Sequence, residues 1–299
     1  MSSPSDQFRQ TMADAGVIPD RPIEPDGTLH RFHVEGDKAG SLNGWAVLHG
    51  DGVPAGCFGS WKTGLFQTWS AKDRRNMSPG ERASQKARFD RAKAMREQER
   101  TQRQARASKR AVALWGAALP AFFDHPYLVA KQVRSHHVRQ LGESLLLPLR
   151  DFDGHLCSLQ FIARDGAKKL LSGGRKRGCF IPVDGPQRSS DASRVLICEG
   201  WATGATLAES EPEALVLAAV DAGNLKPVTL AARKRWPDVD LIVCGDDDRK
   251  TPGNPGVVAA LEAAKAAGAK LALPQWPVSA PLCLSDFNDL ANWMRETVA

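Results

Sequence analysis

Acidic residues follow three apolar runs in the C-terminal third of the sequence. Glu199 comes directly after VLIC, Asp246 begins the triplet DDD after LIVCG, and Asp286 lies in SDFNDL. One such carboxylate alone is most often a helix cap or a surface charge. Several in one crevice repel each other unless cations neutralise them, so the set predicts a divalent metal site. Mg²⁺ is the expected ion, because it prefers carboxylate oxygens and keeps waters that phosphate oxygens can replace.

The segment from Arg194 onward contains elements that would bring these acids together. Apolar runs of strand length (VLICEG, ALVLAAV, VDLIVCG, KLALP) alternate with runs of helical composition (ATGATLAES, LKPVTLAARKRW, PGVVAALEAAKAAG). This alternation predicts parallel strands joined by crossover helices on both faces of a sheet. Ligands of such sheets bind beyond the carboxyl ends of the strands, which is where the acids stand. Asn224, after the second strand, is expected to cap the next helix.

Cations gather in the block before this sheet. SLLLPLRD, HLCSLQFIARD and KKLLSGGRKRGCFIPV are separated by Asp-Gly turns and predict an antiparallel meander. The third run carries five cations around a Gly-Gly turn: Lys168, Lys169, Arg175, Lys176 and Arg177. They either form a solvated face or converge on the phosphates of a triphosphate or a template strand.

The positive charge of the chain, +6 overall, is concentrated in one segment. Residues 71–110 hold 14 Lys or Arg against 5 Asp or Glu, so the rest of the chain is net negative. From Ser78 to Arg110 the composition predicts a long helix with almost no buried face. Such a helix is either a solvent-exposed connector or an arm that binds nucleic-acid phosphates. The cations of this arm would be Arg82, Lys86, Arg91, Arg96, Arg100 and Arg103.

Residues 20–70 alternate short apolar or aromatic runs with glycine-rich turns, which predicts a small antiparallel sheet. Trp45, Trp61 and Trp69 either form the core of this module or stack on unpaired bases beside Lys62. The sequence thus predicts four domains: a β-rich N-terminal module (1–70), a basic helical linker (71–110), a meander subdomain (111–190) and the parallel sheet (191–299).

Other classes of protein are disfavoured. The N-terminus lacks the basic and apolar segments of a secretory signal, and the longest apolar stretch, 111–123, is interrupted by glycine and proline, so we expect a cytoplasmic protein with no membrane span. No phosphate-binding G-x-x-x-x-G-K-[ST] motif occurs, which disfavours an ATPase. Zinc is not expected either, since the nearest ligand set (His30, His33, His49, Cys57) begins with two residues that point to opposite faces of a strand.

VLICEGWATGATLAE, VDAGNLKP, LIVCGDDDRKTPGNPG and DFNDL together resemble the Toprim domain shared by bacterial-type primases, topoisomerases and some nucleases, in the version of plasmid, phage and mobile-element primases. HPYLVAKQV and the meander runs resemble the amino-terminal half of a primase catalytic core. The resemblance covers roughly residues 125–290. It implies an α/β fold: a Toprim parallel sheet flanked by helices, preceded by a basic antiparallel meander, a long basic helix and a small β module.

The resemblance also assigns roles to residues. Glu199, Asp246 and Asp248 match the catalytic acids, and with Asp286 they would hold Mg²⁺, or Mn²⁺ in its place. Thr203 stands where replicative primases often have a further acid, and the zinc-ribbon cysteines of those primases are absent. The nucleotide and template would contact Arg164, Lys168, Lys169, Arg175, Lys176 and Arg177.

The expected function is that of a DNA primase, which synthesises short RNA primers on single-stranded DNA from NTPs by metal-dependent nucleotidyl transfer. A separate replicative helicase is the expected partner, since this chain shows no ATPase motif. Two alternatives remain open. A Toprim nuclease would use the same acids to place a water molecule. A catalytically silent replication accessory would bind nucleic acid without needing a metal.

Overall fold

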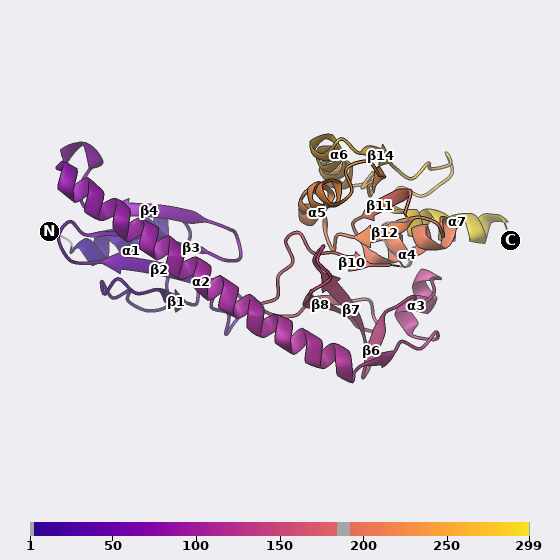
Figure 1. Cartoon of the computed structure of the whole chain (residues 1–299), viewed down its shortest axis with the longest axis horizontal. Helices are drawn as coiled ribbons and strands as arrows, with labels where there is room; N and C mark the ends of the chain where they lie inside the picture. The colour runs from indigo at the N-terminus through magenta and orange to yellow at the C-terminus, as the bar shows by residue number, and fades with distance from the viewer. Residues whose placement is uncertain (1–2, 184–191, 299) are drawn as a thin grey trace. The chain divides into compact units, whose positions relative to one another are not determined.

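The computed structural model describes residues 3–183 and 192–298 (Figure 1). The chain folds as two compact units, Met1–Gln102 and Arg103–Ala299. The long helix α2 (Pro79–Ala117) begins in the first unit and ends in the second. Among the described residues, no helix has both the length and the apolar character needed to span a bilayer.

The first unit is built on an antiparallel sheet of four strands in the order β1-β2-β3-β4. Its elements are α1 (Pro4–Asp14), β1 (His30–Phe32), β2 (Gly44–His49), β3 (Ala55–Ser60), β4 (Phe66–Ser70), a short 3-10 helix η1 (Arg74–Asn76) and the first part of α2. Phe8 and Met12 of α1 pack with Phe32 and Phe58 of the sheet in one buried cluster. The predicted small antiparallel module is confirmed.

The second unit opens with a five-stranded antiparallel meander in the order β5-β6-β7-β8-β9. Its elements are β5 (Leu119–Pro120), α3 (Pro126–Lys131), β6 (Arg139–Leu141), β7 (Ser144–Arg150), β8 (Leu156–Ile162) and β9 (Lys168–Leu170). Strand β7 is apolar on both faces because both are covered. Leu145 and Leu147 join the core of the following sheet, whereas Leu146 packs with Ala111 of α2.

The C-terminal part forms a second five-stranded sheet in the order β10-β12-β11-β13-β14, parallel except for β10. The strands are β10 (Ile181–Pro182), β11 (Arg194–Cys198), β12 (Leu215–Ala218), β13 (Asp240–Cys244) and β14 (Lys270–Ala272), and the helices are α4 (Trp201–Ser210), α5 (Ala222–Arg235), α6 (Pro255–Ala267) and α7 (Phe287–Val298).

Successive residues of β11 point to opposite faces of this sheet, as a strand requires. Leu196 clusters with Trp201 of α4 and with the meander, whereas Val195 clusters with Leu225 of α5 and Ala260 of α6. The predicted parallel sheet with helices on both faces is confirmed.

The long helix was predicted correctly, and between Ser78 and Arg110 only Ala92 and Ala107 are buried. Ala92, Ala107 and Ala111 of α2 are at most 3% exposed. Ala92 packs in a cluster of the first unit and Ala111 in a cluster of the second, so small side chains make these contacts of the helix.

Candidate functional site

Parallel pairing brings two of the acidic segments to one edge of the sheet. Cys198 of β11 lies opposite Cys244 of β13 in the ladder. Glu199 directly follows the first of these strands, and Asp246 stands two residues beyond the second. Asp221 follows β12, the other neighbour of β11. The carboxyl ends of three adjacent strands therefore all carry acids.

These carboxyls share one electrostatic environment. Burial, followed by the charges of Glu199, Asp286 and Asp248, raises the pKa of Asp246 to about 8. Burial and the charges of Asp221 and Asp248 also raise the pKa of Glu199. The pKa of Asp286 is raised as well, with burial as the largest cause. The structure thus brings together all four acids that the sequence singled out.

Asp246 has the feature that best fits a metal ion. Its Oδ1 atom is buried and has no hydrogen-bond partner. A buried carboxylate oxygen without a partner is costly unless a cation compensates it, and carboxylate oxygens are the donors that Mg²⁺ prefers. Within residues 3–183 and 192–298, no three of the four acids place oxygens within 4.8 Å of one another, so they line a site without forming a closed ligand shell.

The three residues of the DDD triplet have different surroundings. Asp247 accepts hydrogen bonds from Trp276 Nε1 at 3.0 Å and Asn254 Nδ2 at 2.7 Å, which anchors the loop. Asp248 Oδ2 accepts from the backbone N–H of Gly256, at the start of α6, at 2.9 Å. A Cβ on Gly256 would lie 2.6 Å from the carbonyl oxygen of Asp246, so only glycine allows α6 to begin this close to the acids.

Asp286 stands directly before α7 and caps it, since the backbone N–H of Asp289 donates to Asp286 Oδ1 at 2.8 Å. Thr203, which is only 1% exposed, lies close enough to Asp286 for its hydroxyl to lower the pKa of that carboxyl. The residue beside Asp286 at this position therefore carries a hydroxyl group and no charge.

Two lysines stand near the acids. Desolvation and the charge of Lys131 lower the pKa of Lys168, while Asp286 and Glu199 act in the opposite direction. Lys131 Nζ lies 3.5 Å from Asp289 Oδ1. Sequence reasoning missed Lys131, because its position depends on α3 packing against α7, where Asn288 donates to the Lys131 carbonyl.

The other residues that were predicted to contact phosphate do not all lie at the acidic site. Lys176 pairs with Asp221, whose charge acts on Glu199, so it reaches the acidic site. Arg175 pairs with Asp151 and Arg164 with Glu143, the latter at 3.0 Å. Both of these ion pairs lie within the meander segment. Lys169 and Arg177 are solvent-exposed.

Asn224 does not cap its helix, contrary to the prediction. Its Nδ2 donates to the carbonyls of Cys179 and Ala219, each at 2.8 Å, and its Oδ1 accepts from the N–H of Gly178 at 2.8 Å. Because Asn224 is 1% exposed, these bonds are shielded from water. They attach the loop that carries Lys176 to the start of α5.

The predicted arm residues divide into two groups. Arg82, Lys86 and Arg91 are exposed on α2. Arg96 lies over the rings of Trp45 and Phe66, Arg100 pairs with Glu97 at 2.6 Å, and Arg103 lies against Gly173. Three tryptophans were expected either to form the core or to stack on bases. Trp45 belongs to the core and is 2% exposed, whereas Trp61 and Trp69 are partly buried.

Residues 194–294 match the family model of the Toprim domain. This part of the chain is a Toprim domain. Two Escherichia coli proteins named DNA primase TraC are each 36% identical to 91% of the chain. The chain spans 26% of the length of one and 20% of the other. A crystal structure of the primase fragment of the bacteriophage T7 primase-helicase protein matches with a TM-score of 0.40 and 17% identity, over 61% of this chain and 78% of that one. The expected resemblance to Toprim-domain primases is confirmed.

Asp246→Asn should stabilise the Toprim domain when divalent cations are chelated. In the folded state the pKa of this carboxyl is raised to about 8. Its ionisation therefore opposes folding progressively as the pH rises from about 4 to about 8. At pH 8 we expect the thermal midpoint of the second unit to rise by about 2–6 °C, and by less at pH 5. Glu262→Gln, which changes an exposed acid on α6, is the matched control. An unchanged or lower midpoint for Asp246→Asn would contradict the electrostatic assignment.

Asn224→Ala should loosen the Lys176 loop, because buried carbonyl and N–H groups lose their partner. We expect a loss of about 2 kcal/mol in unfolding free energy and faster amide exchange at residues 176–179. Urea unfolding and hydrogen exchange measure the two effects. Asn292→Ala, which loses a bond to the Lys131 carbonyl, should leave exchange at this loop unchanged. Equal exchange at 176–179 in both variants would show that Asn224 does not hold the loop.

Proposed function

We propose that this chain carries the catalytic region of a DNA primase that makes short RNA primers on single-stranded DNA from NTPs. The observation that carries the proposal is the edge of the Toprim sheet, where acids with raised pKa values stand near Lys168. A site of this kind suits a divalent cation together with a polyphosphate. The similarity to two proteins named DNA primase supports the proposal, although this chain spans only 26% and 20% of their lengths.

Asp246, Asp248 and Asp286 would hold Mg²⁺, with Mn²⁺ as a substitute. When bound, such an ion would neutralise charge on the reacting phosphate and on the oxygens that enter and leave. Glu199 would accept the proton of the attacking 3′-hydroxyl on a carboxylate oxygen. Its raised pKa suits this role, because a general base works best when its pKa approaches the working pH.

Lysines of the meander and of α3 would bind the triphosphate. Lys168 remains exposed although neighbouring groups desolvate its ammonium, so a phosphate can reach it. Lys131 would add a second cation. Lys176 would exchange its partner Asp221 for a phosphate oxygen, and Lys169 and Arg177 would contact the template backbone.

The proposed partners are the single-stranded template and NTPs. Arg164 and Arg175 have weaker support as nucleotide ligands, because each already pairs with an acid of the meander segment. A separate replicative helicase would unwind the duplex.

Asp246→Asn should abolish primer synthesis while leaving the fold intact. The assay combines the protein with single-stranded DNA, labelled NTPs and Mg²⁺, and resolves short RNA products. We expect a loss of about a hundred-fold or more, since the substitution removes a metal-binding charge at the reacting phosphate. Glu262→Gln is again the control and should retain activity.

Three results would count against this function. Undiminished synthesis by Asp246→Asn would remove this acid from the catalytic site. Cleavage of the DNA without NTPs would favour the Toprim nuclease. Binding of nucleic acid by the wild-type chain with neither product would favour a silent accessory.

A further inference from the structure

We propose that the first unit contains its own binding site for single-stranded DNA, in a cavity of about 270 Å³ beside β4 and α2. Phe66, Trp61, Arg96 and Arg100 are the lining residues that carry the argument, and we call this cavity the aromatic pocket. The proposal rests on the proposed function only in that the primase template is single-stranded DNA. The pocket lies entirely within residues 1–102 and uses none of the Toprim acids.

Phe66 supplies an exposed stacking surface. It is the first residue of β4 and is 52% exposed, although its ring lies 6.0 Å from that of the buried Trp45 at an interplanar angle of 18°. The ring centroid of Trp61 lies 6.0 Å from that of Trp45. The aromatic cluster thus combines the buried Trp45, which fixes it, with the partly buried Trp61 and the exposed Phe66, which can receive a base. Stacking of bases on such rings is tolerant of sequence, because every base has a π-face.

Arginines place positive charge at the same position. The Arg96 guanidinium lies 4.6 Å from the ring centroid of Trp45 and 4.7 Å from that of Phe66. A guanidinium held over aromatic rings keeps its charge and can itself stack on a base. Arg100, one turn further along α2, is exposed and pairs with the exposed Glu97. Bases and phosphates would therefore both find partners here.

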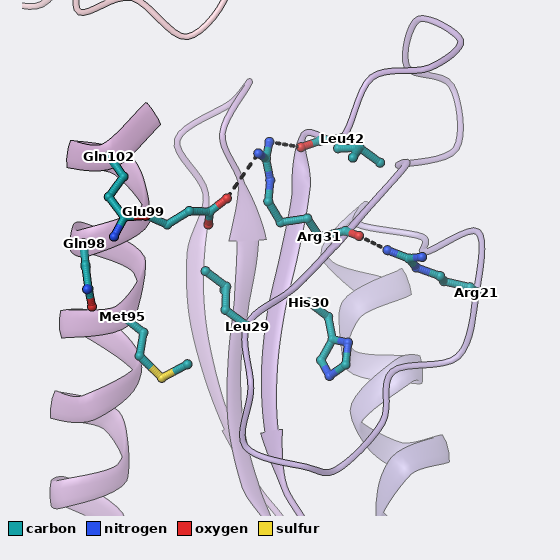
Figure 2. Close-up of a pocket in the computed structure, with 9 residues that line it drawn as sticks. All are labelled: Arg21, Leu29, His30, Arg31, Leu42, Met95, Gln98, Glu99 and Gln102. Atoms are coloured by element: carbon teal, nitrogen blue, oxygen red, sulfur yellow. Dashed lines mark hydrogen bonds and ion pairs between the residues drawn. The ribbon is translucent and has the colours of Figure 1, made fainter. Parts of the chain in front are cut away.

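A larger cavity in the same unit, about 580 Å³, provides a useful contrast (Figure 2). There Arg31 has two partners, since it donates to Glu99 at 3.2 Å and also to the Leu42 carbonyl. Arg21 donates to the carbonyl of Arg31. No exposed aromatic ring lines this cavity. It suits stacked bases less well than the aromatic pocket does.

The charge of the surrounding segment agrees with a nucleic-acid partner. Residues 71–110, which include the helical side of the pocket, contain 14 Lys or Arg against 5 Asp or Glu. Neutralising phosphates with such cations releases counterions, which makes binding tighter at low salt. Stacking then supplies a component of affinity that depends less on salt.

The test is fluorescence anisotropy of a labelled oligo(dT) of about 16 nucleotides with the full chain in EDTA. Phe66→Ala should weaken binding about ten-fold, and Phe66→Trp should restore it, since stacking on one ring is worth about 1–3 kcal/mol. Arg100→Gln should weaken binding less and lower the salt slope by about one. DNA should quench Trp61 emission, and the quenching should be lost in Trp61→Phe, which still binds.

Two matched controls locate the effect. Phe123→Ala removes a phenylalanine of the second unit that is 86% exposed, and Gln98→Ala changes the larger cavity on the same helix. Both should bind like the wild type. Wild-type affinity for Phe66→Ala, or an equal loss for Phe123→Ala, would overturn the proposal.

The proposal for the aromatic pocket and the proposed function can be refuted independently of each other. Asp246→Asn should bind oligo(dT) with wild-type affinity while making no primers, which supports both. If Phe66→Ala binds normally and Asp246→Asn is inactive in primer synthesis, the pocket is refuted and the primase assignment stands. If Phe66→Ala loses binding while Asp246→Asn still makes primers, the pocket stands and the catalytic assignment is refuted.

Discussion

Repulsion among carboxylates at the carboxyl edge of the Toprim sheet is the constraint on which the rest of the second unit depends. Burial and four neighbouring acids raise the pKa of Asp246 to about 8, and one of its oxygens has no partner. Such a group opposes folding unless a cation compensates it. The surrounding structure supports this concentration of charge. Parallel pairing fixes the strands, Gly256 lets α6 begin beside the acids, and Thr203 lowers the pKa of Asp286.

A continuous core holds the basic meander against this edge. Leu145 and Leu147 of β7 belong to the same buried cluster as Leu196 and Trp201 of the Toprim domain. Asn224 adds polar bonds between the meander loop and α5. Close-packed contacts of this kind leave the packed elements little freedom to move relative to one another. The lysines are therefore placed relative to the acids by the fold itself, which is what a site for a metal-bound triphosphate requires.

The sequence predicted the features of the fold that local residue patterns determine. Strand and helix alternation predicted the parallel sheet, and the acids after VLIC and LIVCG followed from it. The sequence could not predict hydrogen-bond partners that depend on tertiary packing. Nothing in the spacing of Asn224 indicates that it holds the Lys176 loop, and nothing in DDD distinguishes the anchoring Asp247 from its neighbours. In the first unit the sequence left core packing and base stacking open for Trp45, which is buried, and it did not indicate that the ring of Phe66 is exposed.

The most direct test of the electrostatic account is calorimetric titration of the chain with Mg²⁺ and Mn²⁺. The account predicts saturable binding by the wild type and binding weaker by on the order of ten-fold or more in Asp246→Asn, since that substitution removes the carboxylate whose buried oxygen lacks a partner. Equal affinity of the two proteins for both ions would contradict the claim that these acids form a divalent cation site.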